Sequence, residues 1–309
     1  MKTKKTKIKK ETLGTVLALL AAIISGFAIP INKMFIVDLD PMVFTAIRAI
    51  VIGIIFFFLS SAQTKFHFRE IRKVSWKWLI AIGIIGGGLA FLFYFTGLKF
   101  TTAGRAAFLH KTLPIYVTIF AFIFLREKVS RRQTFALLVM LIGTFVLMSA
   151  QINPSTFWMD PSFGDVLVLL GTILWGIENT IARHAMLKEE SNWTVSFARM
   201  FIGGIFLFAV AFSFGNAGML LTLSPQQAAN IIISTGILFA YVFSWYWSIR
   251  LINVSKAAAL LLLSPVISLV LGVLIFSEPA PALQIVGSAL ILIGAAFVVR
   301  IKSELVTGA

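Results

Sequence analysis

The sequence consists mainly of apolar segments, each of a length that can cross a lipid bilayer as a helix. One crossing takes about 17–25 mostly apolar residues, and ten segments of the chain fall in this range. Strands of a membrane β-barrel would alternate polar and apolar residues over about ten positions, whereas these segments are apolar throughout. We therefore predict an all-α membrane protein with about ten transmembrane helices, at 13–34, 41–62, 78–99, 103–124, 134–151, 163–185, 194–214, 229–250, 257–276 and 282–300.

Composition argues against several other classes of protein. Only 13% of the 309 residues are charged, against about 25% in soluble domains. The net charge of +15 does not indicate a nucleic-acid partner, because the basic residues lie in short connections and not on one soluble face. The chain has no cysteine and three histidines, so we expect no disulfide, metal site or cofactor. It has no H-E-x-x-H, G-x-S-x-G or ATP-binding motif, so we expect neither an enzyme nor an ATP-driven pump.

Lysine and arginine indicate the orientation in the membrane, because they gather in connections on the cytoplasmic side. Residues 1–12 form a basic N-terminal tail with six lysines, whereas the connections 152–162, 215–228 and 277–281 have no basic residue. The basic residues occur in alternate connections, and the number of predicted helices is even. We therefore predict a multi-pass protein of the plasma membrane with both termini in the cytoplasm.

The first half of the chain is repeated about 150 residues later. LGTVLALLAAIISG at 13–26 aligns with FGDVLVLLGTILWG at 163–176, and RAAFLHKTLP at 105–114 aligns with KAAALLLLSP at 256–265. Apolar composition alone would not align arginine, proline and glutamate at one spacing. Each unit, 13–151 and 163–300, has five predicted helices, so the second must enter the membrane from the opposite side. Aligned pairs include Gly26 with Gly176, Arg48 with Arg199, Arg105 with Lys256, Pro114 with Pro265, and Glu127 with Glu278.

These paired residues resemble the pattern of the EamA family of the drug/metabolite transporter superfamily. The closing helices of the two units, QTFALLVMLIGTFVL at 133–147 and QIVGSALILIGAAFVV at 284–299, resemble that family as well. The resemblance extends from about residue 12 to residue 300. It implies ten helices, cytoplasmic termini and a central cavity between the halves, but it does not fix a substrate.

We expect a secondary transporter that exports a small organic metabolite by alternating access. Inverted repeats are typical of such transporters, because exchanging the packing of two related halves turns an inward opening into an outward one. The expected partners are the lipid bilayer and an anionic or zwitterionic organic solute, with a proton as a candidate coupling ion. The alternative is a non-transporting membrane receptor or scaffold protein, for which an inverted duplication has no evident use.

Two adjacent basic residues are the first candidates for binding a solute. His110 and Lys111 lie about eight residues into the fourth predicted helix, and a charge at the bilayer centre costs about 2.5–3.5 kcal/mol on insertion scales. Their repeat counterparts, Leu261 and Leu262, are apolar. An asymmetric pair of this kind is suited to a carboxylate or phosphate of a solute. The alternative is an ion pair with a neighbouring helix.

The sixth predicted helix has a polar face formed by Trp175, Glu178 and Asn179, which share one side at i, i+3 and i+4. Glu178 is a candidate to carry a proton or bind an amine, and the alternative is that it only neutralises Lys111. Tyr94 and Trp245 are candidates to stack on an organic solute, although such residues more often pack or anchor at the membrane interface.

Six further residues are predicted to serve the scaffold or a gate. Arg48 and Arg199 are duplicated by the repeat, which favours pairing or helix-end bonding over substrate chemistry. Pro114 and Pro265 remove backbone hydrogen bonds inside their helices. Glu127 and Glu278 follow helix ends, where bonding to a helix terminus or gate packing is expected.

The predicted orientation can be tested with topology reporters. A reporter fused after Ala309 should read cytoplasmic, and one inserted beside Pro154 should read external, because the connections near Pro154 lack basic residues. An external reading after Ala309 would contradict both the even helix count and the inverted repeat.

Overall fold

The computed structural model describes residues 2–35, 39–63, 74–149, 159–188, 190–215, 218 and 222–302, and these residues contain no strand. The first half comprises α1 (Lys2–Phe35), α2 (Pro41–Gln63), α4 (Trp76–Ala81), η1 (Ile82–Leu89), α5 (Ala90–Leu98), α6 (Ala103–His110), α7 (Leu113–Leu125) and α8 (Arg131–Ser149). The second half comprises α10 (Phe163–Leu187), α11 (Asn192–Phe197), η2 (Ala198–Ile202), α12 (Gly203–Ser213), α13 (Pro225–Leu251), α14 (Val254–Leu260), η4 (Leu261–Leu263), α15 (Ser264–Phe276) and α16 (Ala282–Arg300).

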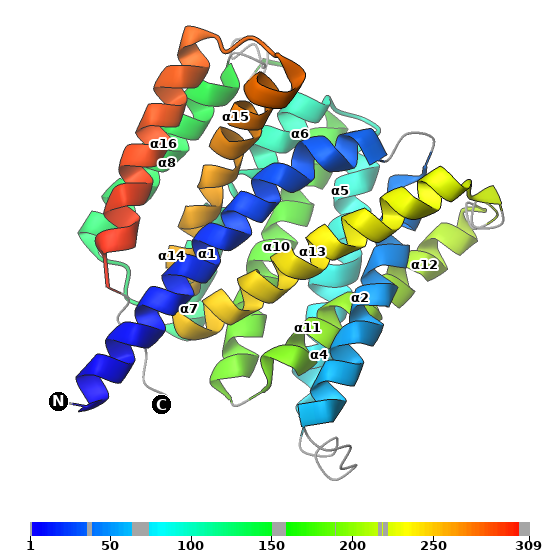
Figure 1. The fold of residues 1–309 in the computed structure, drawn as a ribbon, viewed down its shortest axis with the longest axis horizontal. Coiled ribbons are helices and arrows are strands. Elements are labelled where there is room, and N and C mark those ends of the chain that lie inside the picture. The colour runs from blue at the N-terminus through cyan, green and yellow to red at the C-terminus, as the bar shows by residue number, and fades with distance from the viewer. Residues whose placement is uncertain are drawn as a thin grey trace.

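These elements form ten helices that are long and apolar enough to cross a membrane, which confirms the predicted number. The third and seventh crossings each contain a π-helical segment, η1 and η2, between α-helical ones. The first helix differs from the prediction at its start, because α1 continues back to Lys2 instead of beginning at residue 13. The basic tail is therefore helical over residues 2–12 and extends the first crossing at the end of the bundle that carries both termini (Figure 1).

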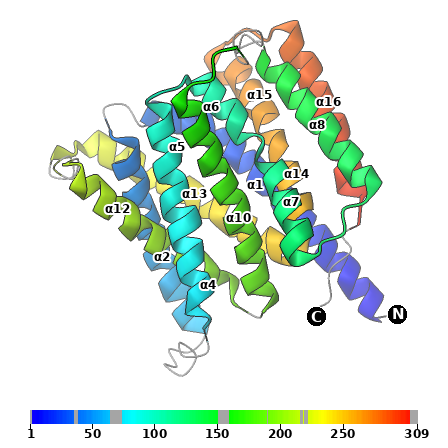
Figure 2. The same ribbon diagram turned by 180° about the vertical axis from the view of Figure 1, so that it is seen from behind.

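The packing of the helices follows the inverted repeat. The first helix of each half lies against the third helix of the other half: α1 packs on α13, and α10 packs on α5 (Figure 1 and Figure 2). The second helices, α2 and α12, pack on each other, and so do the fifth helices, α8 and α16. This exchange of partners is what a two-fold axis in the membrane plane produces, so the fold is two inverted five-helix units.

The fourth and ninth helices are both interrupted near their middle. In the first half α6 ends at His110, and α7 begins at Leu113 with Pro114 in its first turn. In the second half the 3₁₀ segment η4 separates α14 from α15, and Pro265 lies in the first turn of α15. Proline is tolerated there because the first turn has no intrahelical use for its missing N–H.

Glycine allows the third and seventh crossings to touch through their backbones. The run Gly86-Gly87-Gly88 lies in η1, and η1 packs on both η2 and α12. A Cβ atom on Gly87 would overlap the carbonyl oxygen of Arg199 and would lie 2.8 Å from the Cα atom of Gly203. The obstacle is backbone and cannot move aside, so close packing explains this glycine.

We expect Gly87→Ala to destabilise the protein by about 1–3 kcal/mol, because it overpacks this contact. Gly236→Ala is the matched control, since a Cβ atom at Gly236 in α13 meets nothing within 4 Å. Thermal unfolding in detergent should show a lower midpoint for Gly87→Ala and an unchanged or slightly higher one for Gly236→Ala. Equal midpoints in both variants would contradict the contact.

Candidate functional site

A cavity of about 390 Å³ lies between the two halves. Its walls come from α1, α2, α5, α6, α7, α10, η2, α13 and η4, so both units contribute to it. The lining residues of α1 lie near its C-terminal end, at 25–32, and those of α2 near its start, at 45 and 48. The cavity therefore extends from the middle of the bundle toward the face opposite the termini.

Most of the candidate residues from the sequence line this cavity. They are Tyr94, His110, Lys111, Trp175, Asn179 and Trp245, together with Arg48, Arg199 and Pro114 from the predicted scaffold group. Glu178 does not line it, and Pro265, Glu127 and Glu278 lie elsewhere. The repeat therefore contributes unequally, with Pro114 on the wall and its twin Pro265 away from it.

Three aromatic rings form one part of the wall. Tyr94, His110 and Trp175 contact one another, with ring centroids 5.6 Å apart for Tyr94 and His110, 5.0 Å for His110 and Trp175, and 5.4 Å for Tyr94 and Trp175. The histidine contacts are edge-to-face, the arrangement that aromatic pairs favour. His110 thus packs among rings, and Tyr94 and Trp175 offer it no charged partner.

Hydrogen bonds fix the two tryptophans of the wall. The indole N–H of Trp245 donates to Asn179 Oδ1 at 2.7 Å, and Asn179 Nδ2 donates to the carbonyl of Trp175 at 2.8 Å. The indole N–H of Trp175 in turn donates to the carbonyl of Gly86 at 3.0 Å. These polar atoms are satisfied within the protein, so both tryptophans offer ring surface to a ligand.

Glu178 is fully buried beside the cavity and is bound to Arg199. Its Oε2 atom lies 2.5 Å from Arg199 Nη1, and its Oε1 atom accepts a hydrogen bond from the Tyr246 hydroxyl at 2.5 Å. The alternative in which Glu178 neutralises Lys111 is therefore wrong. A carboxylate and a guanidinium that leave water together are stabilised only by good geometry and extra hydrogen bonds, and Tyr246 supplies one of these bonds.

Lys111 lies where the fourth helix is interrupted, and its ammonium group reaches the cavity wall. Its Nζ atom donates to Ser264 Oγ at 2.8 Å, across the interface between the halves. No carboxylate among the described residues lies within ion-pair distance of Lys111. An ammonium has three N–H donors, so Lys111 keeps donors for a bound molecule beside its bond to Ser264.

A cluster around Glu127 joins helices at the end of the bundle near the termini. This carboxylate is 2% exposed and accepts from the backbone N–H of Val254 at 3.1 Å and from the Ser255 hydroxyl at 3.0 Å, at the start of α14. Arg183 Nε lies 3.7 Å from Glu127, and Arg183 Nη1 donates to the carbonyl of Ile249 at 2.6 Å. Helix α14 is thereby tied to α10 and to the end of α13.

Among the described residues, Glu278 forms no such cluster at the opposite end. Arg126 and Ser277, which precede the paired glutamates, both adopt left-handed backbone conformations, with φ of 53° and 52°. The backbone therefore turns in the same way in both halves, yet Glu278 is exposed, and Thr102 caps α6 instead. Arg183 was not recognised from the sequence as a site residue, although it continues the buried face of Trp175 and Asn179 at steps of four.

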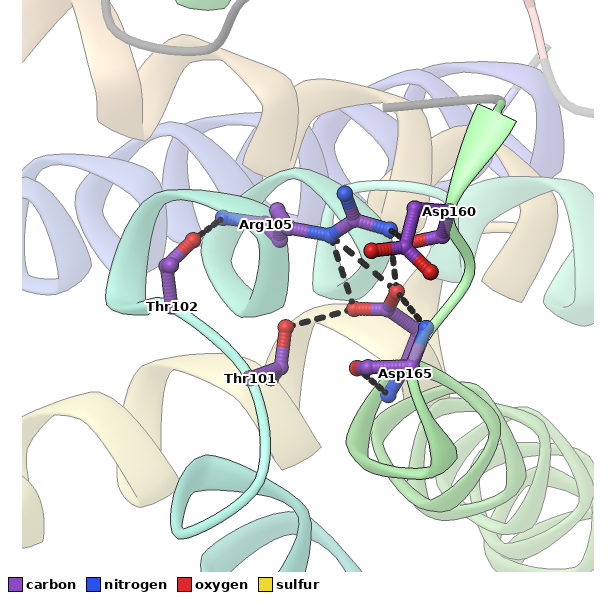
Figure 3. A network of polar contacts seen from close by, with 6 residues as sticks. Thr101, Thr102, Arg105, Asp160 and Asp165 are labelled. Atoms are coloured by element: carbon purple, nitrogen blue, oxygen red, sulfur yellow. Dashed lines mark hydrogen bonds and ion pairs between the residues drawn. The ribbon is translucent and has the colours of Figure 1, made fainter. Parts of the chain in front are cut away.

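Basic residues at repeat-equivalent positions tie the halves together at each face. Arg105 donates to both oxygens of Asp165, at 3.2 and 3.0 Å from Nε, and to the carbonyl of Asp160 at 3.0 Å (Figure 3). Its twin Lys256 donates to Glu11 at 2.7 Å and to the carbonyl of Ile301 at 2.6 Å. The acidic partner comes from the other half in both cases, so each contact holds α6 or α14 against the opposite unit.

The cavity therefore combines apolar rings with positive charge. Lys111 and Arg48 are basic residues on its wall. The buried carboxylate beside the cavity, Glu178, is bound to Arg199 and neutralises neither of them. The described residues include no group of three histidine, aspartate, glutamate or cysteine side chains that could hold a metal ion. This arrangement is suited to binding an anion with an apolar body.

Comparisons with known proteins agree with this architecture. The model of the EamA-like transporter family matches residues 12–149 and 162–300. An uncharacterized transporter of Archaeoglobus fulgidus is 25% identical over 89% of the chain and 94% of that protein. The uncharacterized transporter YoaV of Bacillus subtilis is 27% identical over 88% of the chain and 91% of its own length. A solved crystal structure with 18% identity superposes with a TM-score of 0.75, covering 93% of this chain and 98% of that one.

We expect Glu178→Ala to destabilise the protein by about 3–5 kcal/mol, because it leaves the buried Arg199 guanidinium without its carboxylate. The double variant Glu178→Ala with Arg199→Met should regain much of this loss, since it removes the uncompensated charge. Folded yield and thermal unfolding in detergent measure both effects, with Glu278→Ala as the control at an exposed carboxylate. A double variant no more stable than Glu178→Ala would show that the pair does not act as a unit.

Proposed function

The chain belongs to the EamA-like transporter family, and from that premise we propose that it moves a small anionic or zwitterionic organic solute across the plasma membrane by alternating access. It is a multi-pass membrane protein and a transporter of that family, and its described residues include ten helices that can span a bilayer. The direction we propose is export, and it rests on the resemblance to drug/metabolite exporters. The cytoplasmic position of both termini rests on the charge of the connections.

The observation that supports an anionic group on the solute is the environment of Lys111. A charge in the hydrocarbon region costs about 2.5–3.5 kcal/mol on insertion scales, and the repeat shows that this position does not need one, since its twin is Leu262. Lys111 bonds Ser264 and has no carboxylate within ion-pair distance among the described residues. A carboxylate or phosphate of the solute would offset this cost. A zwitterionic solute also carries such an acidic group.

Alternating access is supported by the difference between the two ends of the bundle. The Glu127 cluster joins α7, α10 and α14 at the end near the termini, while the cavity extends toward the opposite end. Exchanging the two arrangements between the repeats would close the cavity on one side and open it on the other. Glu278 and the start of α6 would then form the contact that Glu127 and the start of α14 form here.

Proton coupling through Glu178 and the alternative function as a receptor or scaffold both remain to be tested. Coupling to a proton on Glu178 would require this carboxylate to leave Arg199 and Tyr246 during each cycle, since it is bound to both. The alternative function, a receptor or scaffold protein, predicts binding without flux of any solute. Comparing metabolites released by cells with and without the protein distinguishes these functions and identifies the solute.

We expect Lys111→Ala to weaken transport of the solute found in that comparison by about tenfold or more, the effect of losing one charge-assisted hydrogen bond. The variant protein should still reach the membrane, because Lys111 lines the cavity and its removal leaves no described carboxylate without its partner. Lys111→Arg should recover transport only in part, since a planar guanidinium does not replace a compact ammonium. Lys99→Ala is the control, at an exposed lysine that follows the end of α5 and is not on the cavity wall. Full transport by Lys111→Ala would contradict the proposed role.

A further inference from the structure

Arg48 is a second cation on the cavity wall, and its partners are all uncharged. Its Nη1 atom donates to Ser234 Oγ at 2.7 Å, its Nη2 atom to Thr45 Oγ1 at 3.3 Å, and its Nε atom to the carbonyl of Phe44 at 3.3 Å. These bonds use three of the five guanidinium N–H groups, which leaves one on each terminal nitrogen. No carboxylate among the described residues lies within ion-pair distance of Arg48, which is only 7% exposed.

The repeat offers an internal comparison for this arginine. Its twin Arg199 binds Glu178 and lies 3.4 Å from the Tyr246 hydroxyl. In the repeat alignment, Ala28 takes the position of Glu178, two residues after the paired Gly26 and Gly176. Phe95 takes the position of Tyr246, ten residues before the paired Arg105 and Lys256. Ala28 and Phe95 both line the cavity. The first half thus has open space where the second half has a carboxylate and a hydroxyl.

The surroundings of Arg48 add polar groups to this space. Asn32 and Thr45 line the cavity beside it, and Asn32 Oδ1 accepts from Ser234 at 2.5 Å. The amide nitrogen of Asn32 has no partner among the residues that the structure describes, so it remains a donor toward the cavity. The same cavity wall also carries apolar side chains, among them Phe91, Phe95 and Leu238.

We propose that Arg48, with Asn32 and Thr45, forms a second anion-binding subsite, and that the transported solute is an organic dianion whose acidic groups contact Arg48 and Lys111. This inference rests on the proposed function and narrows its substrate class. A monoanion would leave one of the two cations on the cavity wall without a counter-charge, which is costly in a membrane. Both cations line one cavity of about 390 Å³, a volume in the range of pockets that bind a small organic ligand.

A purely structural role for Arg48 is the competing explanation. Its bond to Ser234 ties α2 to α13, and Ser234 continues the link to Asn32 on α1. In that case changes at Arg48 would lower the stability of the empty protein without altering the preference between ligands. Binding and stability must therefore be measured separately on the same variants.

The test uses purified full-length protein in detergent and calorimetric titration with matched probes. The probes are straight-chain dicarboxylates from malonate to suberate, the monocarboxylates of equal length, butyl phosphate, and butylamine as a cation. The series of lengths finds the spacing of the two subsites, and butyl phosphate distinguishes a doubly charged single group from two separate carboxylates. We expect the wild type to bind the best dicarboxylate about tenfold or more tightly than its monocarboxylate, as one added charge-assisted contact gives.

Two pairs of variants identify the residue responsible. Arg48→Gln should abolish the preference for the dicarboxylate, while Ser234→Ala, which keeps the charge and removes its protein partner, should retain it. Ala28→Glu should also abolish the preference, because it gives Arg48 the carboxylate that Arg199 has, and Ala28→Gln, of equal size and no charge, should retain more of it. The Ala28 pair leaves Arg48 in place, so it tests the proposal even if Arg48→Gln fails to fold.

The outcomes separate this inference from the function on which it rests. A preference for dicarboxylates that is unchanged in Arg48→Gln and Ala28→Glu overturns the second subsite and leaves the transport of a monoanion intact. Loss of the preference in Ser234→Ala to the same extent as in Arg48→Gln assigns Arg48 to helix packing and overturns it too. Binding of butylamine but of none of the acids overturns both the subsite and the proposed anionic substrate.

Discussion

In the hydrocarbon core of a bilayer no water replaces a missing hydrogen-bond partner, so each polar group within the bundle needs a partner in the protein or a ligand. Much of the structure follows from this constraint. The indole N–H groups, the amide of Asn179 and the carboxylate of Glu178 are all bound within a few ångströms of one another. Against this background, Arg48 and Lys111 have only hydroxyl and carbonyl hydrogen-bond partners among the described residues, and both lie on the cavity wall.

Some basic residues of the bundle occur in both copies of the inverted repeat, and others occur in one copy only. Arg105 and Lys256 each bind an acidic side chain of the other half, so this feature has been kept in both copies. Arg48 and Arg199 are also duplicated, yet only Arg199 has a carboxylate among the described residues. His110 and Lys111 occur in one copy alone. The contacts of Arg105 and Lys256 are therefore symmetric, whereas the residues that occur in one copy alone, His110 and Lys111, lie on the cavity wall.

The same asymmetry gives the molecule two different ends. Glu127 and Glu278 follow the same left-handed turn, but only Glu127 reaches the start of the helix that it faces. A single unit therefore has the local structure for either arrangement, and the choice between them depends on how the halves pack. Glycine-mediated contact between η1 and α12, where Gly87 meets Gly203, keeps the backbones close along that interface.

The sequence by itself determined the number of crossings, their approximate bounds and the inverted repeat, because apolar length and repeated polar residues do not depend on tertiary contacts. Most of the candidate binding residues that it indicated lie on the cavity wall, since a polar residue in an apolar helix must face the interior. It could not decide partners: Glu178 binds Arg199 and not Lys111, and Arg183 joins Glu127. Spacing along one helix says nothing of the rotation and depth of its neighbours, and only the packing of the two halves fixed which charges met a counter-charge and which were left facing the cavity.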